Sequence, residues 1–292
     1  MQAVGAGSCQ KNRPGQIVIS QTVGAQASLS GQEVAMRQTQ CRFMWLVGAL
    51  LLAGCAVATP PSRLSQYVAP VVADESASPG LPVQRPLRTA LVVLADRSAQ
   101  EAAPGLPEEA QARLAEALRG QVNRGFPIAI ERVVNLGEIP VGAPLPNWID
   151  LAGQQGVDFV LVVILSSTEQ EYPVSLFLGW TTHLQPGFRR DNWSLAEAAF
   201  LDGRTGRQLL RAEGRAMATL DSPTAPGISQ WYPVIYLRPQ NPERRIWPPS
   251  YEGAPVTLRV VSMEQAATRL AGNLQRAWVE QRELELAALP GP

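Results

Sequence analysis

A short apolar run, residues 43–53, ends in Gly54 and Cys55 and divides this 292-residue chain into two unequal parts. A transmembrane helix needs roughly 20 apolar residues, so the run is too short to span a bilayer. It has the length of the apolar core of a signal peptide, and Arg37 and Arg42 provide the positive charge that precedes such a core. We therefore expect the folded part of the chain to begin only after this run.

The four residues Leu52-Ala53-Gly54-Cys55 resemble the lipobox of bacterial lipoproteins. The resemblance implies that residues 36–54 are a signal peptide, that cleavage falls between Gly54 and Cys55, and that Cys55 carries acyl chains. Several acyl chains hold a protein stably at a membrane, because each buried methylene contributes roughly 0.8 kcal/mol. Ala56, rather than aspartate, resembles the pattern for transfer to the outer membrane, which implies a lipid-anchored protein facing the periplasm.

Residues 1–35 are polar and show neither helical nor strand periodicity. An export signal normally begins close to its initiating methionine. We therefore predict that Met36 is the true start and that residues 1–35 are a non-native or disordered leader. Two alternatives stay open, namely an unusually long basic region before the apolar core and an ordinary buried segment that ends in Gly-Cys by chance.

The chain after Cys55 contains 21 arginines, no lysine and 24 acidic residues, a net charge of −3. Nucleic-acid binding requires a concentrated basic surface, so we expect no nucleic acid among the partners. Cys9 and Cys41 both precede the predicted cleavage, which leaves the mature chain without a disulfide. Its fold must then depend on a hydrophobic core, which about 200 residues can bury without covalent crosslinks.

Segment 55–88 is rich in proline, serine and alanine and holds few large apolar side chains. A segment of this composition buries too little surface to become ordered. We predict that it is a semi-rigid tether. At about 3.1 Å per residue, roughly 30 residues would hold the domain several tens of ångströms from the lipid.

The folded domain is expected to span residues 89–282, and its first half alternates strand and helix patterns. The continuous apolar run 89–95 predicts a strand that is covered on both faces. Pro107 suits the first position of a helix that Gly125 can end. The next predicted elements are a strand over about 127–135, a short helix between Asn147 and Gly156, and a strand over 158–166. Strands separated by helices favour right-handed crossovers and a parallel core.

The second half predicts antiparallel pairing and a final helix. Segments 195–201 and 208–218 flank the loop 202–206, whose glycines permit the positive φ of a hairpin turn. Ser262 and Gln265 have capping-box spacing at the start of a helix predicted over 262–282, with residues 283–292 as a tail. The predicted fold class is α/β, a mixed sheet with a βαβαβ start, an antiparallel hairpin and a C-terminal helix packed on the sheet.

This order of elements behind a lipobox resembles the periplasmic domain of a group of envelope proteins. The group comprises the curli-secretion lipoprotein CsgG, the penicillin-binding-protein activator lipoproteins and the amino-terminal domain of TolB. Segments 126–132, 156–162 and 199–206 look like its strand and turn sequences. The resemblance implies a non-enzymatic assembly or interaction factor that binds another envelope protein or itself, with no cofactor. Pore-forming members have two amphipathic membrane hairpins, which we do not identify here.

An enzymatic function is the main alternative. His183 is the one histidine of the chain, so a multi-histidine metal site is excluded, and no nucleophile-elbow, phosphate-loop or zinc-protease motif occurs. A carbohydrate- or peptidoglycan-active hydrolase could still use a pair of carboxylates. The candidates that could converge in the fold are Asp150, Asp158, Glu169, Glu171 and Asp191.

Aromatic residues and prolines are concentrated between residues 172 and 251, and segment 221–256 has eight prolines and no helical period. A long structureless connection in a compact domain is usually functional or disordered. We predict a partner surface that includes Trp180, Trp193, Trp231, Tyr232, Tyr236 and Trp247. Two alternatives are that these rings only pack the loop onto the sheet, and that segment 174–180 contacts the membrane interface.

Overall fold

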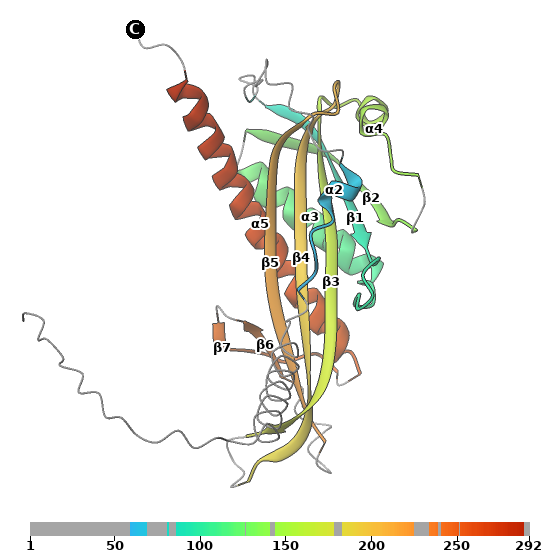
Figure 1. Ribbon diagram of the computed structural model, residues 1–292, viewed down its shortest axis with the longest axis vertical. Helices are drawn as coiled ribbons and strands as arrows, with labels where there is room; N and C mark the ends of the chain where they lie inside the picture. Colours follow the sequence, from blue (N-terminus) through green and yellow to red (C-terminus); the bar gives the residue numbers. More distant parts are fainter. Residues whose placement is uncertain are drawn as a thin grey trace, which may run out of the picture. The chain divides into compact units, whose positions relative to one another are not determined.

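The computed structural model describes residues 59–68, 81, 86–125, 127–140, 144–177, 183–224, 234–238, 241–250 and 252–288 (Figure 1). The predicted leader, signal peptide and lipidation site, including Gly54 and Cys55, lie outside these residues. The elements in chain order are α2 (Leu64–Tyr67), β1 (Leu87–Asp96), α3 (Glu108–Gly125), β2 (Ile128–Glu138), α4 (Trp148–Gln155), β3 (Phe159–Leu176), β4 (Gln185–Asp202), β5 (Gln208–Pro223), β6 (Val234–Arg238), β7 (Asn241–Ile246) and α5 (Ala254–Ala287).

The strands form one seven-stranded sheet in the order β2-β1-β3-β4-β5-β6-β7. Strand β1 is parallel to both β2 and β3, whereas every later pair is antiparallel. The predicted mixed α/β sheet with a C-terminal helix is therefore confirmed. Helix α4 also has its predicted ends, because Asn147 Oδ1 accepts a hydrogen bond from the Ile149 amide and Gly156 adopts φ 66°.

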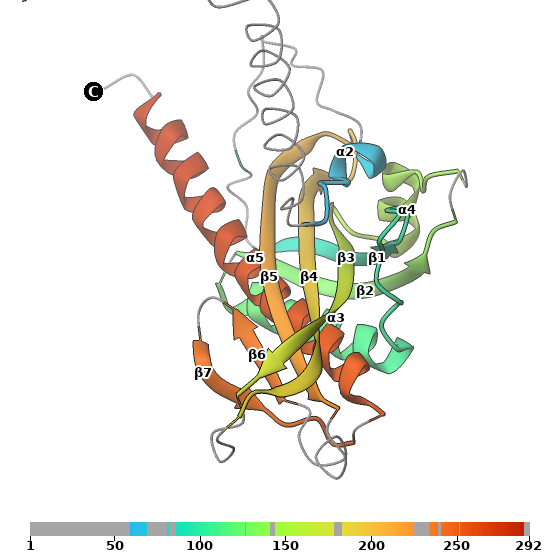
Figure 2. The same cartoon turned by 60° about the horizontal axis from the view of Figure 1, so that its bottom comes forward.

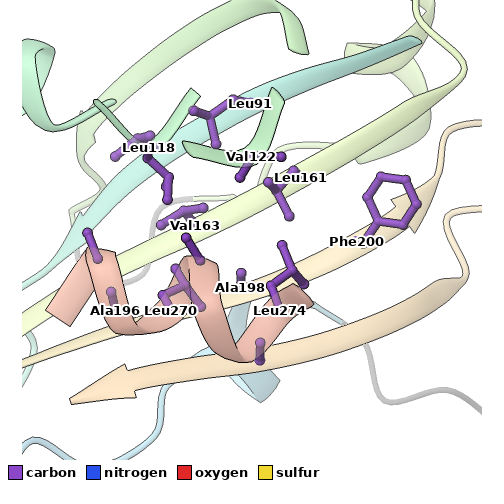
Figure 3. Close-up of a cluster of buried hydrophobic side chains, with 14 of the residues drawn as sticks. Leu91, Leu118, Val122, Leu161, Val163, Ala196, Ala198, Phe200, Leu270 and Leu274 are labelled. Atoms are coloured by element: carbon purple, nitrogen blue, oxygen red, sulfur yellow. The ribbon is translucent and has the colours of Figure 1, made fainter. Parts of the chain in front are cut away.

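The two faces of the sheet are covered by different elements. Helices α3 and α5 lie on one face, which we call the α5 face, and α2 and α4 lie on the other, which we call the arm face (Figure 1). Figure 3 shows the α5-face core, in which Leu161, Val163 and Ala198 meet side chains from both helices. The Phe200 ring stacks on Phe159 at 5.2 Å between centroids. Burial on both faces explains the continuous apolar runs in β1 and β3.

Strands β3, β4 and β5 are much longer than predicted, with 18, 18 and 16 residues. The predictions of 158–166, 195–201 and 208–218 stop where the apolar pattern gives way to polar and charged residues. These residues stay in the sheet because they pair across strands, as in Glu171 opposite Arg190 and Arg189 opposite Asp221. The long β3–β4 hairpin was not among the predicted elements.

Helix α5 begins at Ala254, eight residues before the predicted start. Gly253 precedes its first turn and Pro255 occupies an early position, where a proline needs no amide hydrogen. The predicted capping box is therefore wrong. Ser262 lies inside the helix, fully buried, and its hydroxyl donates to the Asn192 carbonyl oxygen at 3.2 Å. The helix also extends to Ala287, into the segment predicted as a tail.

The prediction of a structureless connection over 221–256 is wrong in part. Residues 234–238 form β6, which pairs with β5, and residues 241–246 form β7 at the sheet edge. Ile235 and Leu237 pack against Leu258 of α5 in a small separate cluster. The prolines in this region lie mostly outside these strands, which is why the sequence pattern concealed them.

The described residues of the predicted tether, 59–68, 81 and 86–88, include side chains that are buried in the domain, and the rest of that segment lies outside the described residues. Leu64, Tyr67 and Val68 are buried against the arm face, and Leu81 is buried in the α5-face core. The Leu81 amide donates to Glu285 at 2.6 Å, and Arg282 donates to the Leu81 carbonyl oxygen at 3.0 Å. The composition of the segment does not predict this burial, because a few apolar residues among prolines are enough to fix a segment on a sheet that is already formed.

Gly214 is the point at which α5 comes closest to β5. A Cβ atom there would lie closer than 3.0 Å to backbone atoms of Ala266 and Leu270. We expect Gly214→Ala to push the helix off the sheet and to lower the free energy of unfolding by about 1–3 kcal/mol, as in overpacked cores. Urea denaturation followed by circular dichroism measures this.

Gly272→Ala is the matched control, because a Cβ atom at that position of α5 meets nothing within 4 Å. This substitution should leave stability unchanged or raise it by about 0.5–1 kcal/mol, since alanine favours a helix interior. Equal effects of the two substitutions would contradict the close contact between α5 and β5.

Candidate functional site

The most distinctive site in the described chain is the contact between the sheet and residues 59–68, which we call the N-terminal arm. This segment lies on the arm face and contains the single turn of α2 (Figure 1). Leu64, Tyr67 and Val68 pack into the arm-face core beside Trp148 and Leu201. The arm is therefore part of the folded domain, although it begins only four residues after Cys55.

Glu197 of β4 holds the arm in place. Its side chain is fully buried in the middle of the sheet. It accepts hydrogen bonds from the Ser62 hydroxyl at 2.5 Å and from the backbone amides of Arg63 at 2.6 Å and Leu64 at 3.3 Å. Arg211 of β5 approaches the same carboxylate at 3.4 Å. Charge-assisted bonds of this kind are about twice as strong as neutral ones.

The residues directly opposite Glu197 in the sheet cannot donate to it, and the donor from a neighbouring strand is Arg211, at 3.4 Å. The partners of Glu197 in the sheet are Ile164 on β3 and Glu213 on β5. One is apolar and the other is itself an acceptor, so the main donors come from the arm. A buried carboxylate without donors is strongly destabilising. The arm is thus the group that makes a charge at this position compatible with the fold.

The far end of the arm is fixed by two further hydrogen bonds. The Tyr67 hydroxyl donates to Asp96 Oδ2 at 3.0 Å, and the Trp148 indole donates to the Tyr67 carbonyl oxygen at 3.0 Å. Burial and the contact with the Asp96 carboxylate raise the pKa of Tyr67 to about 12. Asp96 also accepts from the amide and hydroxyl of Ser98. The contact therefore joins the arm, α4 and the end of β1.

The near end of the arm lies beside the middle of β4 and β5. Arg215 donates to the Pro60 carbonyl oxygen at 3.3 Å. Thr59 and Pro60 line a shallow cavity together with Trp193 and Met217. The arm thus passes Trp193 first and Glu197 second, so it runs in the same direction as β4.

Two polar clusters follow along the strands beyond the arm. On the arm face, Asp191 accepts from the Tyr172 and Thr219 hydroxyls, both at 2.7 Å. Arg189 next to it binds Asp221 through two hydrogen bonds, at 2.6 and 2.8 Å. This bidentate pair raises the pKa of Arg189. The geometry is that of a structural network, since both Asp191 oxygens are already engaged.

The cluster on the α5 face centres on Glu169. Arg190 lies 3.4 Å from its carboxylate and Arg259 of α5 lies 3.8 Å away. Burial raises the pKa of Glu169, while the two guanidinium groups act in the opposite direction. Arg259 is buried and also donates to the Pro104 carbonyl oxygen at 3.4 Å. These contacts fix the first turns of α5 on the sheet.

The five acidic residues considered for hydrolysis do not converge. Asp150 and Asp158 are exposed and lie at the opposite end of β3 from the other three. Glu169 and Glu171 share the α5 face, whereas Asp191 lies on the arm face. Each of these three is engaged by a neighbouring arginine or hydroxyl group. No opposed carboxylate pair is formed by these candidates.

The residues predicted to form a partner surface are dispersed. Trp180, Trp231 and Tyr232 lie outside the described residues. Trp193 is buried, with 8% of its surface exposed, and packs beside the arm. Tyr236 is half-buried on β6, and Trp247 is 54% exposed just after β7. Of the described residues in this group, only Trp247 presents a largely exposed ring.

Exposed apolar side chains gather at the end of the β3–β4 hairpin. Phe177 is 70%, Leu184 63% and Phe188 45% exposed, and we call these three residues the hairpin tip. Leu176, just before them, is buried and packs over Gly187, where a Cβ atom would lie closer than 3.0 Å to it. The hairpin is therefore firmly packed up to the point at which its apolar side chains become exposed.

The sequence analysis missed Glu197 as a site residue. One signal was available, because this glutamate interrupts the apolar stretch 195–201, in which every other residue is apolar. A charge in a strand buried on both faces needs a partner, which identifies the position but not the partner. The donors are 133 to 135 residues away in the sequence.

Within the described residues, no helix is long and apolar enough to cross a membrane. The same part of the chain contains no group of three or more histidine, cysteine, aspartate or glutamate side chains that could hold a metal ion.

Comparisons with known proteins give few leads. Neither protein-family models nor curated proteins match this chain. Lipoprotein GNA1162 from Neisseria meningitidis is 14% identical, with a TM-score of 0.26 over 45% of this chain and 83% of that chain. A neuraminyllactose-binding hemagglutinin homologue from Helicobacter pylori is 9% identical, with a TM-score of 0.34 over 72% and 97%. The PelC dodecamer from Paraburkholderia phytofirmans is 15% identical, with a TM-score of 0.21 over 53% and 84%. These scores are too low to support a conclusion about function.

The role of Glu197 can be tested with Glu197→Gln. The amide group keeps the size but removes the negative charge and one of the two acceptor oxygens, so the three donors of the arm compete for a single neutral oxygen. We expect a loss of about 1–3 kcal/mol in the free energy of unfolding, the cost of an unsatisfied buried donor. Hydrogen exchange should also become faster at the amides of Arg63 and Leu64.

Glu213→Gln is the control for this experiment. Glu213 faces Glu197 across the sheet, but its side chain is 44% exposed and pairs with Arg215. An exposed pair of this kind contributes less than about 1 kcal/mol. If the Arg63 and Leu64 amides remain protected in Glu197→Gln, the carboxylate does not hold the arm.

Proposed function

We propose that the protein is a periplasmic lipoprotein, anchored in the outer membrane through Cys55, that acts as a non-catalytic assembly or interaction factor of the cell envelope. One structural observation carries the proposal. The chain is already fixed on the folded domain five to eight residues after Cys55, through the bond of Arg215 to Pro60 and the contacts of Glu197 with Ser62 and Arg63. An acyl group on Cys55 would therefore hold the domain itself close to the leaflet.

Three further features support this function. The residues that precede Cys55 resemble a lipobox. The order of strands and helices resembles the CsgG, penicillin-binding-protein activator and TolB group, whose members bind other envelope proteins or themselves. The acidic residues Glu169, Asp191 and Glu197 are engaged in contacts that join elements of the fold. A hydrolase would need a carboxylate pair free to face substrate, and no observation favours that alternative.

Acylation is tested by replacing Cys55. In a Gram-negative host grown with an alkyne fatty acid, the wild-type protein should become labelled and float with outer-membrane vesicles. Cys55→Ser should lose the label and retain the leader, because both modification and cleavage depend on this thiol. Gel mobility and click labelling measure both effects.

Cys41→Ser is the matched control, because Cys41 lies within the predicted signal peptide and is removed from the mature chain. This variant should be labelled like the wild type. Equal labelling of Cys55→Ser and wild-type protein would refute the proposed anchor.

Partner binding is tested at Trp247, the exposed ring that follows β7. Truncating a tryptophan at the centre of an interface typically costs 2 kcal/mol or more, so we expect Trp247→Ala to weaken capture of an envelope partner by about 30-fold or more. Crosslinking in intact cells, followed by purification of the acylated protein, measures the loss.

Leu286→Ala is the control, since Leu286 is 68% exposed near the end of α5. It should leave capture unchanged, and both variants should have the wild-type melting temperature. Retention of every partner by a folded Trp247→Ala protein would exclude this side chain as an interface anchor.

A further inference from the structure

We propose that the hairpin tip, Phe177, Leu184 and Phe188, contacts the same lipid leaflet that holds Cys55 and enters it only to the depth of the interface. This inference rests on the proposed acylation of Cys55. It assigns a second membrane contact to the protein and fixes which end of the sheet faces the lipid.

The first step is the polarity of the two ends of the long strands. At one end the exposed side chains are the apolar hairpin tip. At the other end, β4 and β5 are joined by the turn 203–207, whose Arg204 and Thr205 are exposed. The Arg204 and Thr205 amides donate to Asp202, so the turn itself is polar, and the exposed apolar side chain next to it, Ile149, belongs to α4 and not to the strands. Only one end of β3 and β4 therefore has side chains suited to a lipid surface.

The second step is the direction of the arm. From α2 back toward Cys55, the arm passes Glu197 and then reaches Trp193 and Met217. On β4 this is the direction of decreasing residue number, which leads to Phe188 and Leu184. Figures 1 and 2 both show α2 near the α4 end of the sheet, with the β3–β4 hairpin ending at the opposite end. The first described residue of the arm, Thr59, thus lies on the side of Glu197 that is nearer to the hairpin tip.

The third step is the length of chain available. Four residues connect Thr59 to Cys55, which at about 3.4 Å per residue span at most about 14 Å. From Trp193, beside Thr59, to Phe188 is five residues of β4, or about 17 Å at about 3.3 Å per residue, and to Leu184 it is nine residues, or about 30 Å. The chain to Cys55 therefore reaches about as far as Phe188, and Leu184 extends farther, so acyl chains on Cys55 and the apolar side chains of the tip can reach one leaflet together. A free tether of thirty residues would impose no such relation.

The fourth step limits the depth of the contact. Directly behind the tip, the strands carry Arg189 paired with Asp221, and Arg190 paired with Glu171. Transfer of such charges into hydrocarbon is costly, whereas arginine side chains are well accommodated at the headgroup level. The apolar part is therefore confined to the tip, which fits interfacial insertion and not a spanning segment. Residues 178–182 lie outside the described residues and are not needed for this inference.

The experiment places a spin label at the tip. The mature chain has no cysteine other than Cys55, so Leu184→Cys introduces a single free thiol in the acylated protein. The nitroxide-labelled protein is reconstituted in phosphatidylethanolamine and phosphatidylglycerol vesicles. Its collision rates with oxygen, which partitions into lipid, and with a water-soluble nickel chelate are then measured. Arg204→Cys, at the polar end of the same strands, is the matched control.

We expect the label at position 184 to collide more with oxygen than with nickel, and the label at position 204 to show the reverse. Phe177→Cys should repeat the result for position 184. If mass spectrometry finds Cys55 acylated but both labels are equally accessible to nickel, the tip contact is wrong and the anchor stands. If Cys55 is unmodified, the proposed function itself fails. Concentration-dependent protection of position 184 in a Cys55→Ser background without vesicles would instead identify a second copy of the chain as the partner and overturn the proposal.

Discussion

A carboxylate buried in the centre of a sheet must find hydrogen-bond donors, because leaving it unpaired would cost a large part of the stability of a domain. Glu197 meets this requirement mainly with Ser62 and the amides of Arg63 and Leu64, since the residues directly opposite it on β3 and β5 cannot donate and Arg211 is farther away, at 3.4 Å. The interaction is mutual. The sheet needs the arm to satisfy a charge, and the arm, which holds only a single turn of helix, needs the sheet to be ordered.

The position of the arm changes how a lipid anchor would act on this protein. A flexible tether leaves a domain free to rotate and to sample a large volume. An arm that is hydrogen-bonded to the sheet from the fifth residue after the anchor limits both the distance and the orientation of the domain. The length of strands β3, β4 and β5 then bears on membrane contact, because these strands extend the apolar hairpin tip well beyond the core that the helices cover. Their central polar clusters, around Asp191 and Glu169, keep the strands paired where few apolar side chains remain.

Much of the fold could be predicted from local patterns. The apolar runs in β1 and β3, the cap at Asn147 and the glycine at Gly156 each specify an element with little help from distant residues. Predictions were wrong where a distant partner decided the outcome. Segment 254–261 becomes helical because Leu258 packs against β6 and Arg259 binds Glu169 of β3. The polar halves of β3, β4 and β5 remain strands because each strand carries residues that pair with charged or polar residues of its neighbour.

The sequence by itself determined the alternation of strands and helices in the first half of the domain, the absence of cysteines after Cys55, and the resemblance to a lipobox that motivates the proposed anchor, because each of these depends on residue types that are adjacent or regularly spaced. Only the tertiary structure decided the direction and fixed position of the arm, the separation of the candidate carboxylates, and the apolar end of the β3–β4 hairpin. The position of the arm depends on residues more than a hundred positions apart, such as Ser62 and Glu197, and no local periodicity specifies which distant donor a buried charge will meet. The other two features depend on the pairing of β3 with β4, which the sequence of the polar halves of these strands does not predict.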